Sequence, residues 1–495
     1  MVTKMKKKLI SLFSVLLICC VLFQSTAFAV TKYPMNYIYV DGKNESISDS
    51  SGRIYIPITY SVNTAFSYIE DPGATSFNNP DDLFIDAKDN IYVADTGNNR
   101  IVKLSPDGET LAIYYDASGS PFVEPRGVFV AEDETIYIAD SGNGRIVKMD
   151  QQGTLLEEYG KPESELLENL QSFDPSKIAV GPTGYMYILV GKEFMSIDMN
   201  NQFKGYIGST ELDFSLSQLL INMFATKEQK KKMDKRNPPS YNNFMIDSEG
   251  RFVACSSAKK DQIRIINSVG RNIYEKGFYG EILDIDDTTN EYVYPMFIDL
   301  TSDQNGVISA LDQRSGHIYQ YDQEGNLLTV FAGLGDNKGY FEKPVSIAAD
   351  SEGNLFVLDA VRNNIQKFQS TTFMDKIHEA SQLYFDGKYD ESLGLWEEIV
   401  TINADYPLAR RRIGAIYYKE KDYERSKDEY KLADDMEGYS EAFSKYRHEF
   451  VRNHFVVTIL IAAAVIAVLV ILVILAKKYA DRVRDKIYGE RRGEK

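Results

Sequence analysis

The sequence predicts a mainly β fold: a six-bladed β-propeller, followed by an array of α-helical hairpins and one transmembrane helix. The first observation is a repeat, because YVADTGNNRIVKLSPDG at Tyr92 returns as YIADSGNGRIVKMDQQG at Tyr137, 45 residues later. The second is a set of short alternating strand patterns that recur at 40- to 50-residue spacing, between turn signals such as SPDG and DQEG. The third is an uncharged run near the C-terminus, residues 455–476. Radial repetition of four-stranded blades explains the first two observations, and a membrane-spanning helix explains the third.

Residues 1–29 carry the features of a cleaved signal peptide. A basic stretch that ends at Lys8 precedes an apolar run, residues 9–23, and Ala27-Phe28-Ala29 supplies a small-residue cleavage pattern. We therefore expect the mature chain to begin at Val30.

Net charge excludes one class of partner. The whole chain carries −17, and removing the leader (+4) and the last 19 residues (+4) leaves −25 for the part between them. Such a surface repels nucleic acid and anionic lipid headgroups, and it favours cations or basic partners. We expect no nucleic-acid partner.

Cys255 is the only cysteine after the leader, so the external part cannot form an internal disulfide and must be held together by its own core.

The propeller is expected over residues 61–370, after an N-terminal hairpin segment, residues 30–60. Six units each begin with a short strand pattern, at Pro80, Pro125, Pro175, Tyr241, Pro295 and Pro344. The last unit shows only three strand patterns before the chain becomes helical. The upstream segment AFSYIEDPG, residues 65–73, resembles the fourth strands of other units. We expect it to complete the last blade and close the ring, which removes an exposed sheet edge.

The segments VADTGNNRIVKLSPDG and IADSGNGRIVKMDQQG resemble NHL repeats, the six-bladed propeller units of many bacterial surface proteins. The resemblance covers roughly residues 60–368. It implies that the acid ending the second strand and the basic residue opening the third brace a turn. The residues to which it assigns this structural role are Asp95 with Arg100, Asp140 with Arg145, Asp312 and Asp359. His317 and Asn364 stand at the basic position beside the last two acids, and the third unit departs from the pattern with LVGKEF.

Ligand-binding residues are expected where the first strands of the blades line the central channel. The candidates are Asp82, Arg126, Lys177, Asn243 and Ser346. The third position of the six first-strand patterns reads Asp82, Gly127, Lys177, Asn243, Phe297 and Ser346.

Gluconolactonase-like propellers suggest an enzymatic alternative, because they hold a divalent cation with Glu, Asn and Asp near these positions. A calcium ion needs several convergent oxygen ligands, and a set that includes a lysine and a phenylalanine offers few. We therefore predict no catalytic residue and no metal site, and Asp82 and Asn243 are the residues to test for bound calcium.

Residues 209–240 interrupt the propeller between the third and fourth units. Leu216, Leu219, Leu220, Met223 and Phe224 fall at helical spacing, before a lysine-rich run at residues 227–236. The segment is either a helical loop folded over one face of the propeller or a basic docking element for a partner or an acidic wall polymer.

Residues 371–453 change to a 34-residue period. The offset relates five pairs of positions: Ala380 and Gly414, Tyr384 and Tyr418, Tyr389 and Tyr423, Ser392 and Ser426, Trp396 and Tyr430. This spacing resembles about two tetratricopeptide repeats, with small residues where helices approach closely. Ala404 stands where that family usually has proline. The repeats are interpreted as a stalk, with peptide capture as the alternative.

Residues 455–476 are 22 residues without a charge, or about 33 Å of helix, which is enough to cross a bilayer. The tail that follows, residues 477–495, holds eight Lys or Arg against four Asp or Glu, and this excess favours the cytoplasmic side. The sequence therefore predicts a single-pass type I protein of the cell membrane, with the propeller and the helical repeats outside.

These features together resemble a bacterial membrane-anchored NHL-repeat protein with C-terminal tetratricopeptide-like repeats. We expect a binding or scaffold protein rather than an enzyme, whose partners are other envelope or membrane proteins, a transporter complex among them. The alternative is a divalent-cation-dependent hydrolase of the lactonase or esterase kind, with its site in the channel. A signalling role would need a separate partner, because a 19-residue tail is too short for a catalytic domain.

Overall fold

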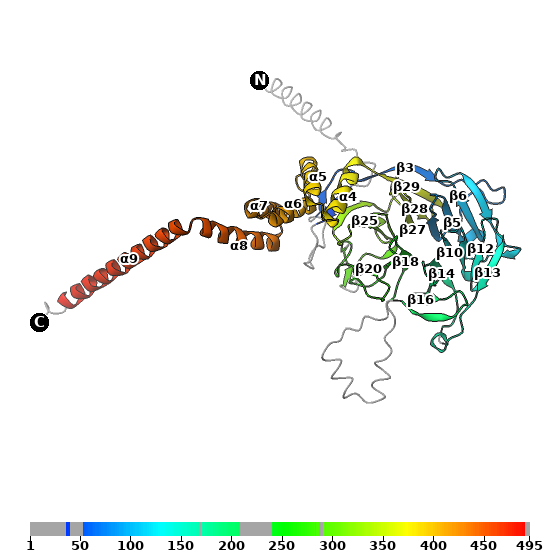
Figure 1. Ribbon diagram of the computed structural model, residues 1–495, viewed down its shortest axis with the longest axis horizontal. Helices are drawn as coiled ribbons and strands as arrows, with labels where there is room; N and C mark the ends of the chain where they lie inside the picture. The colour runs from blue at the N-terminus through cyan, green and yellow to red at the C-terminus, as the bar shows by residue number, and fades with distance from the viewer. Residues whose placement is uncertain are drawn as a thin grey trace, which may run out of the picture. The chain divides into compact units, whose positions relative to one another are not determined.

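The computed structural model describes residues 36–39, 53–168, 170–207, 240–282, 284–286 and 291–490 (Figure 1). The predicted signal peptide and residues 209–239 of the predicted insertion lie outside the described residues. Residues up to Ala404 form one compact unit and residues from Asp405 form a second.

The first unit is a propeller of six antiparallel blades (Figure 1). The first strands of blades 2, 3 and 6 begin at the predicted residue, and those of blades 1, 4 and 5 begin two residues after it. Blade 1 consists of β4 (Asp82–Ile85), β5 (Ile91–Asp95), β6 (Arg100–Leu104) and β7 (Thr110–Tyr114). Blade 2 consists of β10 (Pro125–Val130), β11 (Ile136–Asp140), β12 (Arg145–Met149) and β13 (Leu155–Tyr159). Blade 3 consists of β14 (Pro175–Val180), β15 (Met186–Val190), β16 (Glu193–Ile197) and β17 (Phe203–Tyr206).

Blades 4 to 6 depart from this plan in different ways. Blade 4 contains β18 (Asn243–Ile246), β19 (Phe252–Cys255) and β20 (Ile263–Ile266). Blade 5 contains β23 (Phe297–Ser302), β24 (Ile308–Asp312), β25 (His317–Tyr321) and β26 (Leu327–Ala332), and it is extended by β1 (Tyr37–Tyr39) and β2 (Arg53–Tyr55). Blade 6 contains β27 (Pro344–Ala349), β28 (Leu355–Asp359) and β29 (Asn364–Ser370), and it is completed by β3 (Tyr60–Phe66). Two short hairpins lie between blades: β8 (Asp116–Ala117) with β9 (Ser120–Pro121), and β21 (Asp284–Asp286) with β22 (Glu291–Val293).

The described residues of blade 4 form three strands, not the expected four. After β20 the chain makes a single bridge, between Ile266 and Asn272, and turns away. The side-chain oxygen of Asn272 accepts hydrogen bonds from the backbone N–H of Ile265 and Tyr274, at 3.1 Å each. These bonds occupy Ile265 N–H, a donor that a fourth strand could use.

An N-terminal strand closes the ring, as the sequence predicted, but a different stretch supplies it. β3 pairs with β29 from Tyr60 opposite Ser370 to Phe66 opposite Ile365. Only Ala65 and Phe66 of the expected segment, residues 65–73, belong to this strand. The rest of that segment forms a turn, in which Ile69 N–H donates to Thr75 O.

The N-terminal hairpin, whose place the sequence left open, adds to the outer edge of blade 5. Tyr37 of β1 pairs with Val330 of β26, and β2 pairs with β1. A buried carboxylate fixes it there: Glu281 accepts hydrogen bonds from Tyr37 Oη (2.9 Å) and from Arg53 Nη2 (2.7 Å). The N-terminal segment therefore contacts two adjacent blades.

The hydrophobic core lies mainly between neighbouring blades. Tyr92, Ile101 and Tyr114 of blade 1 pack with Val128 and Ile138 of blade 2 in one buried cluster. A second cluster joins blades 2 and 3, a third joins blades 3 and 4, and a fourth joins blade 6 to blade 1. Because the middle strands are buried on both faces, they read as continuous apolar runs.

The recurring acids hold each blade to the loop that enters it. A side-chain oxygen of Asp95 accepts from the N–H of Asn78, and one of Asp140 accepts from Val123 N–H, at 2.7 and 2.8 Å. Asp312 and Asp359 accept from the corresponding amides, those of Met296 and Glu342, at 2.8 and 2.7 Å. All four carboxylates are fully buried.

In blades 1 and 2 the same acid also pairs with the base that opens the third strand. Arg100 Nε lies 2.7 Å from Asp95 Oδ2, and Arg145 Nε lies 2.7 Å from Asp140 Oδ2. The intervening turn ends in the left-handed region, at Asn99 (φ 54°) and Gly144 (φ 63°), a conformation that suits asparagine and glycine.

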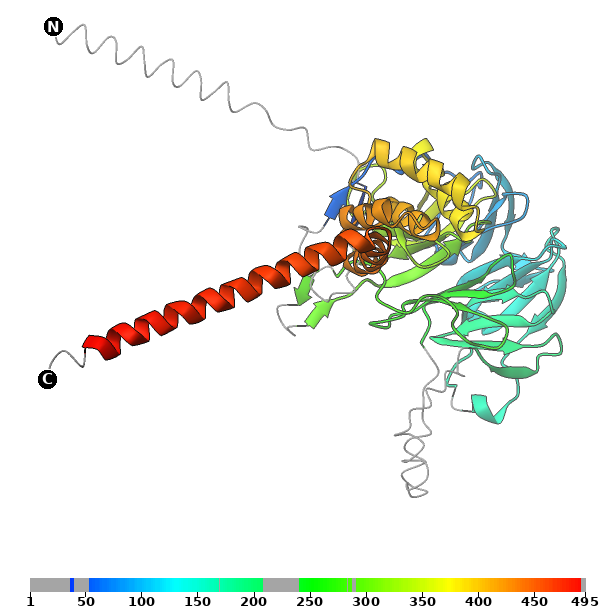
Figure 2. The ribbon, with the colours of Figure 1, turned by 60° about the vertical axis from the view of Figure 1, so that its left-hand side comes forward.

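Two helices complete the first unit: α4 (Thr372–Phe385) and α5 (Tyr389–Ile402). α4 follows β29 directly and lies against the propeller (Figure 2). Thr371 secures this junction, because its N–H donates to Thr59 O (2.9 Å) and its Oγ1 donates to Ile58 O (2.6 Å). Farther along α4, Gln382 Oε1 accepts from Gln323 Nε2 of blade 5 at 2.7 Å.

The second unit contains α6 (Pro407–Lys419), α7 (Tyr423–Leu432), α8 (Met436–Asn453) and α9 (Phe455–Glu490). The pair α6–α7 repeats contacts of α4–α5 at the 34-residue offset. Ser392 Oγ donates to Ala380 O and Ser426 Oγ donates to Gly414 O, both at 2.8 Å. The two tyrosine pairs, 384 with 389 and 418 with 423, are edge-to-face at 5.2 and 5.4 Å. The 34-residue period therefore corresponds to a structural repeat.

One helix in the described part of the chain is long and apolar enough to cross a membrane: residues Phe455–Val483 of α9, which contain an 18-residue stretch with a mean hydropathy of 3.5. The helix continues into the basic tail as far as Glu490. This finding is compatible with a single-pass anchor at the predicted position.

We expect Arg100→Ala to lower the free energy of unfolding by about 3 kcal/mol, because Asp95 would stay buried without its cation. Urea denaturation of the whole chain measures the change. Lys88→Ala is the control, since Lys88 and Glu134 form an exposed ion pair and its loss should leave the unfolding midpoint unchanged. Equal effects of the two substitutions would contradict a structural role for the buried pair.

Candidate functional site

The central channel contains a cavity of about 130 Å³ that is lined by the first strands of all six blades. Most of its wall is apolar, with side chains such as Leu83, Ile178 and Phe244. Two charged side chains also line it, Lys177 of blade 3 and Asp299 of blade 5.

Three of the five candidate residues meet at this channel. Lys177 Nζ lies 2.6 Å from Asp82 Oδ1, so an ion pair joins blade 3 to blade 1. Ser346 Oγ of blade 6 lies 3.3 Å from the same Asp82 oxygen. It also donates a 2.7 Å hydrogen bond to Asp299 Oδ2. We call these four residues, Asp82, Lys177, Asp299 and Ser346, the channel network.

The channel network also binds the backbone of neighbouring blades. Asp82 Oδ2 accepts from Val128 N–H of blade 2 (3.1 Å), and Ser346 Oγ accepts from Leu83 N–H of blade 1 (3.2 Å). Asp299 Oδ2 accepts from Ile347 N–H of blade 6 (2.8 Å). In each case a side-chain oxygen accepts a hydrogen bond from a backbone N–H of the next blade around the ring. These acceptors therefore satisfy buried donors that the strand ladders do not use.

Sequence inspection missed Asp299 because it set Phe297 at the third position of blade 5. The ladder shows otherwise: Phe297 is opposite Asp312, as Pro125 is opposite Asp140, and Asp299 takes the place of Gly127. A constant interval would have found it, since Asp82 and Ser346 each stand 13 residues before the acid that ends the second strand. The same count back from Asp312 reaches Asp299.

The other two candidates do not join the channel network. Arg126 is partly exposed and makes longer ion pairs, at 3.6 Å, with Asp81 and Glu124. The side-chain oxygen of Asn243 accepts from the N–H of the next residue, Phe244, at 2.8 Å. Gly127 fills the position in blade 2 because a Cβ there would lie 2.7 Å from the carbonyl oxygen of Ser176.

Burial sets the protonation of the channel network. It raises the pKa of Asp299 to about 6, with Lys177 opposing the rise and Asp82 adding to it. Burial alone would lower the pKa of Lys177, but the charges of Asp82 and Asp299 outweigh burial and the pKa is raised. Burial also raises the pKa of the nearby Cys255 thiol, which keeps that side chain from acting as a thiolate nucleophile.

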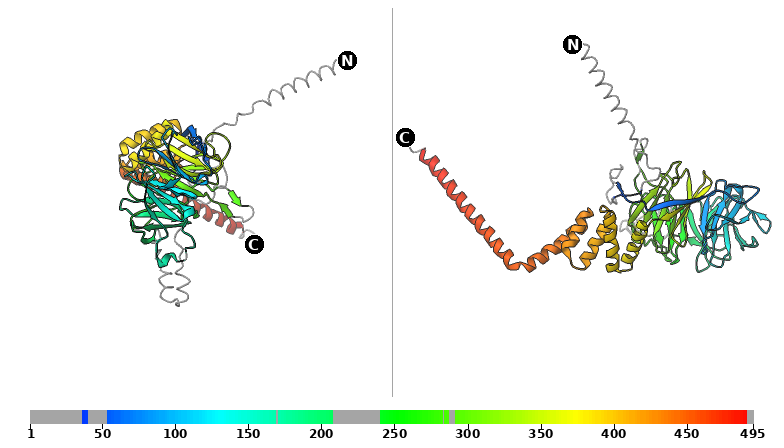
Figure 3. Two further views of the ribbon diagram at one scale, coloured as in Figure 1. Left: turned by 90° about the vertical axis from the view of Figure 1, so that its right-hand side faces the viewer. Right: turned by 90° about the horizontal axis from the view of Figure 1, so that it is seen from above.

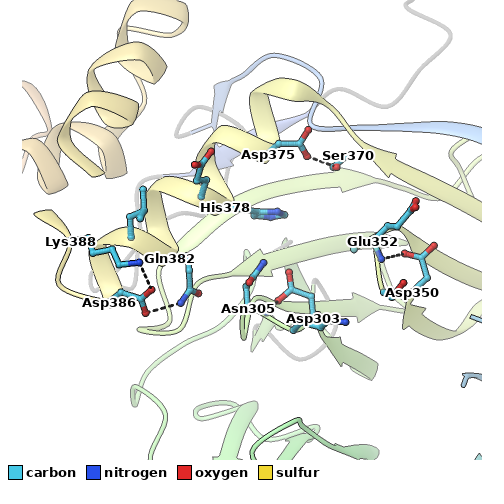
Figure 4. A pocket seen from close by; sticks show the side chains of 15 residues that line it. Asp303, Asn305, Asp350, Glu352, Ser370, Asp375, His378, Gln382, Asp386 and Lys388 are labelled. Carbon is cyan, nitrogen blue, oxygen red and sulfur yellow. Dashed lines mark hydrogen bonds and ion pairs between the residues drawn. The ribbon is translucent and has the colours of Figure 1, made fainter. Parts of the chain in front are cut away.

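A larger and more open pocket lies between α4 and the turns of blades 5 and 6 (Figure 4). Its volume is about 410 Å³. Its lining includes six carboxylates and one lysine, and we call it the acidic pocket. These residues are Asp303, Asp350, Glu352, Asp375, Glu379, Asp386 and Lys388.

The walls of the acidic pocket are held by different contacts. Asp303 and Asp350 belong to tight turns, in which each carboxylate accepts backbone amides of its own turn. On α4, His378 Nε2 lies 3.1 Å from Gln320 Oε1 of blade 5. Burial lowers the pKa of His378 to about 4, so the imidazole is neutral near pH 7 and does not offset the acids.

In the part of the chain that the structure describes, no three His, Cys, Asp or Glu side chains are grouped as ligands for a metal ion. A divalent cation in the channel would have to compete with Lys177 for Asp82. It would also have to displace the amides that Asp82 and Asp299 bind.

Comparison with known proteins identifies the repeat. The family model of the NHL repeat matches residues 77–104, which contain β4, β5 and β6. The chain therefore contains an NHL repeat in blade 1. No curated protein matches the chain.

Solved structures resemble the chain at low identity. A streptogramin B lyase is 15% identical, over 69% of this chain and 94% of its own, with a TM-score of 0.37. A virginiamycin B lyase from Staphylococcus aureus is 12% identical, over 63% and 99%, with a TM-score of 0.38. A propeller provisionally assigned as a gluconolactonase is 13% identical, over 60% and 90%, with a TM-score of 0.38. At such values these proteins indicate nothing about what this chain binds.

We expect Asp299→Asn to flatten the dependence of stability on pH. The folded-state pKa of Asp299, about 6, lies above the ordinary value of 3.8. The protonated carboxyl therefore stabilises the fold fully below about pH 4, and this stabilisation is lost as the pH rises through 6. The loss between pH 4.5 and pH 7.5 is about 2 kcal/mol.

Urea unfolding at these two pH values measures the effect. The stability difference between the wild type and Asp299→Asn should shrink by that amount from the lower pH to the higher. Asp107→Asn, in an exposed turn, is the matched control and should differ from the wild type equally at both. A constant difference for Asp299→Asn would show that this carboxyl titrates normally.

Proposed function

We propose that this chain is an extracytoplasmic, membrane-anchored binding or scaffold protein. Its NHL-type propeller, and the helices that follow, would hold a protein or another envelope component outside the cell. The anchor would be residues 455–476, and the basic tail would lie in the cytoplasm. The combination of a leader, an acidic external part and a basic end supports this orientation.

The observation that carries the proposal is how the polar groups of the propeller are used. In the channel, where propeller enzymes place their chemistry, Asp82, Asp299 and Ser346 are bound to neighbouring blades, and Asp82 also pairs with Lys177. The cavity beside them, about 130 Å³, is small and largely apolar. Open polar space lies in the acidic pocket instead, at about 410 Å³. This distribution favours recognition at the surface over catalysis in the channel.

The charge of the acidic pocket indicates the chemistry of the partner. Six carboxylates against one lysine, on an external part of net charge −25, favour a basic segment of another protein. We infer that the partners are other envelope or membrane proteins, with a transporter complex as one assembly of this kind.

Charge reversal tests the acidic pocket. Glu379→Lys should weaken the association by about fivefold or more, because it places a cation where a basic segment would bind. The measurement is lysine-directed crosslinking in intact cells, in which peptides joined to Lys388 are identified and quantified. Glu132→Lys makes the same change on an exposed turn of blade 2 and should leave these crosslinks unchanged. Equal crosslinking in both variants would contradict binding at the acidic pocket.

Metal analysis separates this proposal from the hydrolase alternative. We expect the purified external part to contain less than stoichiometric calcium or zinc. We also expect Asp82→Asn to leave any slow lactone hydrolysis unchanged, since the Asp82 carboxylate is engaged by Lys177. A bound ion that is lost together with lactonase activity in Asp82→Asn would establish the hydrolase instead.

A further inference from the structure

Helix α8 carries a continuous row of aromatic side chains. Tyr439, Phe443, Tyr446 and Phe450 are spaced by four, three and four residues, so these four lie on one side of α8. His454, the residue after the helix, stacks on Phe450 and continues the row. Successive ring centres are 5.7, 6.5, 6.2 and 4.5 Å apart. We call this row the aromatic face.

Another side of α8 supplies the packing within the second unit. Ala442 is fully buried, and a Cβ added at Gly438 would lie 2.5 Å from the ring of Tyr430 on α7. The aromatic face is less covered. Phe443 is 39% exposed and Phe450 is 49% exposed, although Tyr446 has Lys427 over its ring. A row of this length, with two exposed phenylalanines between half-buried tyrosines, is unusual for the surface of a protein in water.

The chain itself indicates what covers this face. α8 ends at Asn453 and the apolar helix α9 begins at Phe455, so a single residue separates them. That residue, His454, leaves the helical conformation, at φ −116° and ψ 30°. The chain changes direction there (Figure 3). If α9 crosses a bilayer, the C-terminal end of α8 lies at the bilayer surface, and the bend allows α8 to follow that surface.

The residue types fit the headgroup layer of a bilayer. Tyrosine and phenylalanine place an apolar ring at the boundary between hydrocarbon and water, and tyrosine keeps its hydroxyl hydrated. The charged residues of α8 balance, with three acids and three bases, so attraction to anionic lipid is not the driving force. The driving force is instead the burial of the apolar rings.

We propose that the aromatic face of α8 lies in the headgroup layer of the membrane that α9 spans. The inference rests on the membrane anchor of the proposed function and is independent of the ligand of the acidic pocket. α8 is then an interfacial helix that fixes the depth and tilt of α6 and α7 at the membrane.

Tryptophan reporters test this placement. The chain has one tryptophan, Trp396, which is buried in α5 of the other unit, so Trp396→Phe gives a silent background. Phe443→Trp and Phe450→Trp then report from the aromatic face. His448→Trp, on the side of α8 that faces away from it, is the matched control, and Leu469→Trp reports from the middle of α9.

The full chain is reconstituted into phosphatidylcholine vesicles whose acyl chains carry bromine either near the headgroup or near the bilayer centre. We expect the Phe443→Trp and Phe450→Trp reporters to lose fluorescence to shallow bromine more than to deep bromine. The His448→Trp reporter should keep its fluorescence, and the Leu469→Trp reporter should lose it to deep bromine. A second set of reporter variants retains Trp396, and the fluorescence of Trp396 is subtracted from theirs. This set controls for any loss of folding caused by Trp396→Phe.

Three results would overturn the proposal. Quenching of the Phe450→Trp reporter no stronger than that of the His448→Trp reporter would place the aromatic face in water. An unquenched reporter whose emission shifts to the blue as protein density rises would assign the face to a second copy of the chain. Failure of deep bromine to quench the Leu469→Trp reporter would remove the anchor itself, and with it the membrane part of the proposed function.

Discussion

The pairing of β3 with β29 is the interaction on which the rest of the fold depends. Without it, β29 would be an open sheet edge, and blade 6 would be held to the rest of the ring only by side chains and single backbone contacts. With it, the first and last described strands of the ring belong to one sheet. Contacts between blades 6 and 1 then form as well, including Ser346 with Leu83 and Asn363 with the amide of Asn79.

The closure also positions the helices of the first unit. Thr371 stands at the end of β29, and its backbone and side chain bind Thr59 and Ile58, which directly precede β3. α4 therefore begins from a point that is fixed on both sides, and the acidic pocket forms between it and the turns of blades 5 and 6.

The polar side chains of the channel and those of the acidic pocket have different roles. Around the channel, the first strands of the blades present amides that their own ladders leave unpaired, and burial makes each such amide costly. Asp82, Asp299 and Ser346 satisfy three of them, so these side chains serve the ring. The raised pKa of Asp299 is a consequence of this burial and needs no catalytic role. In the acidic pocket, the carboxylates of Asp303 and Asp350 accept backbone amides of their own turns, and the carboxylates of Glu352 and Glu379 add to the charge of the lining.

The sequence by itself determined the architecture, because local patterns encode it. The 45-residue echo and the six strand beginnings predicted six blades, and the 34-residue offset predicted a helical repeat whose contacts recur. An N-terminal strand in the last blade could also be expected, since the sixth unit was one strand short. The uncharged run from residue 455 predicted the one described helix that could span a membrane.

Only the tertiary structure decided which residues meet. Residues 60–66 rather than 65–73 complete blade 6, because strand register depends on which side chains are buried by the neighbouring blade. Blade 4 has three described strands, and Asn272 accepts the Ile265 N–H of β20 that a fourth strand could use. Asp299 joins the channel network from more than 100 residues away, because β23 begins at Phe297, and the bulge that blade 5 shares with blades 2, 3 and 6 then sets Asp299 at the channel position. Long-range contacts of this kind follow from how the ring closes, and no short stretch of sequence contains that information.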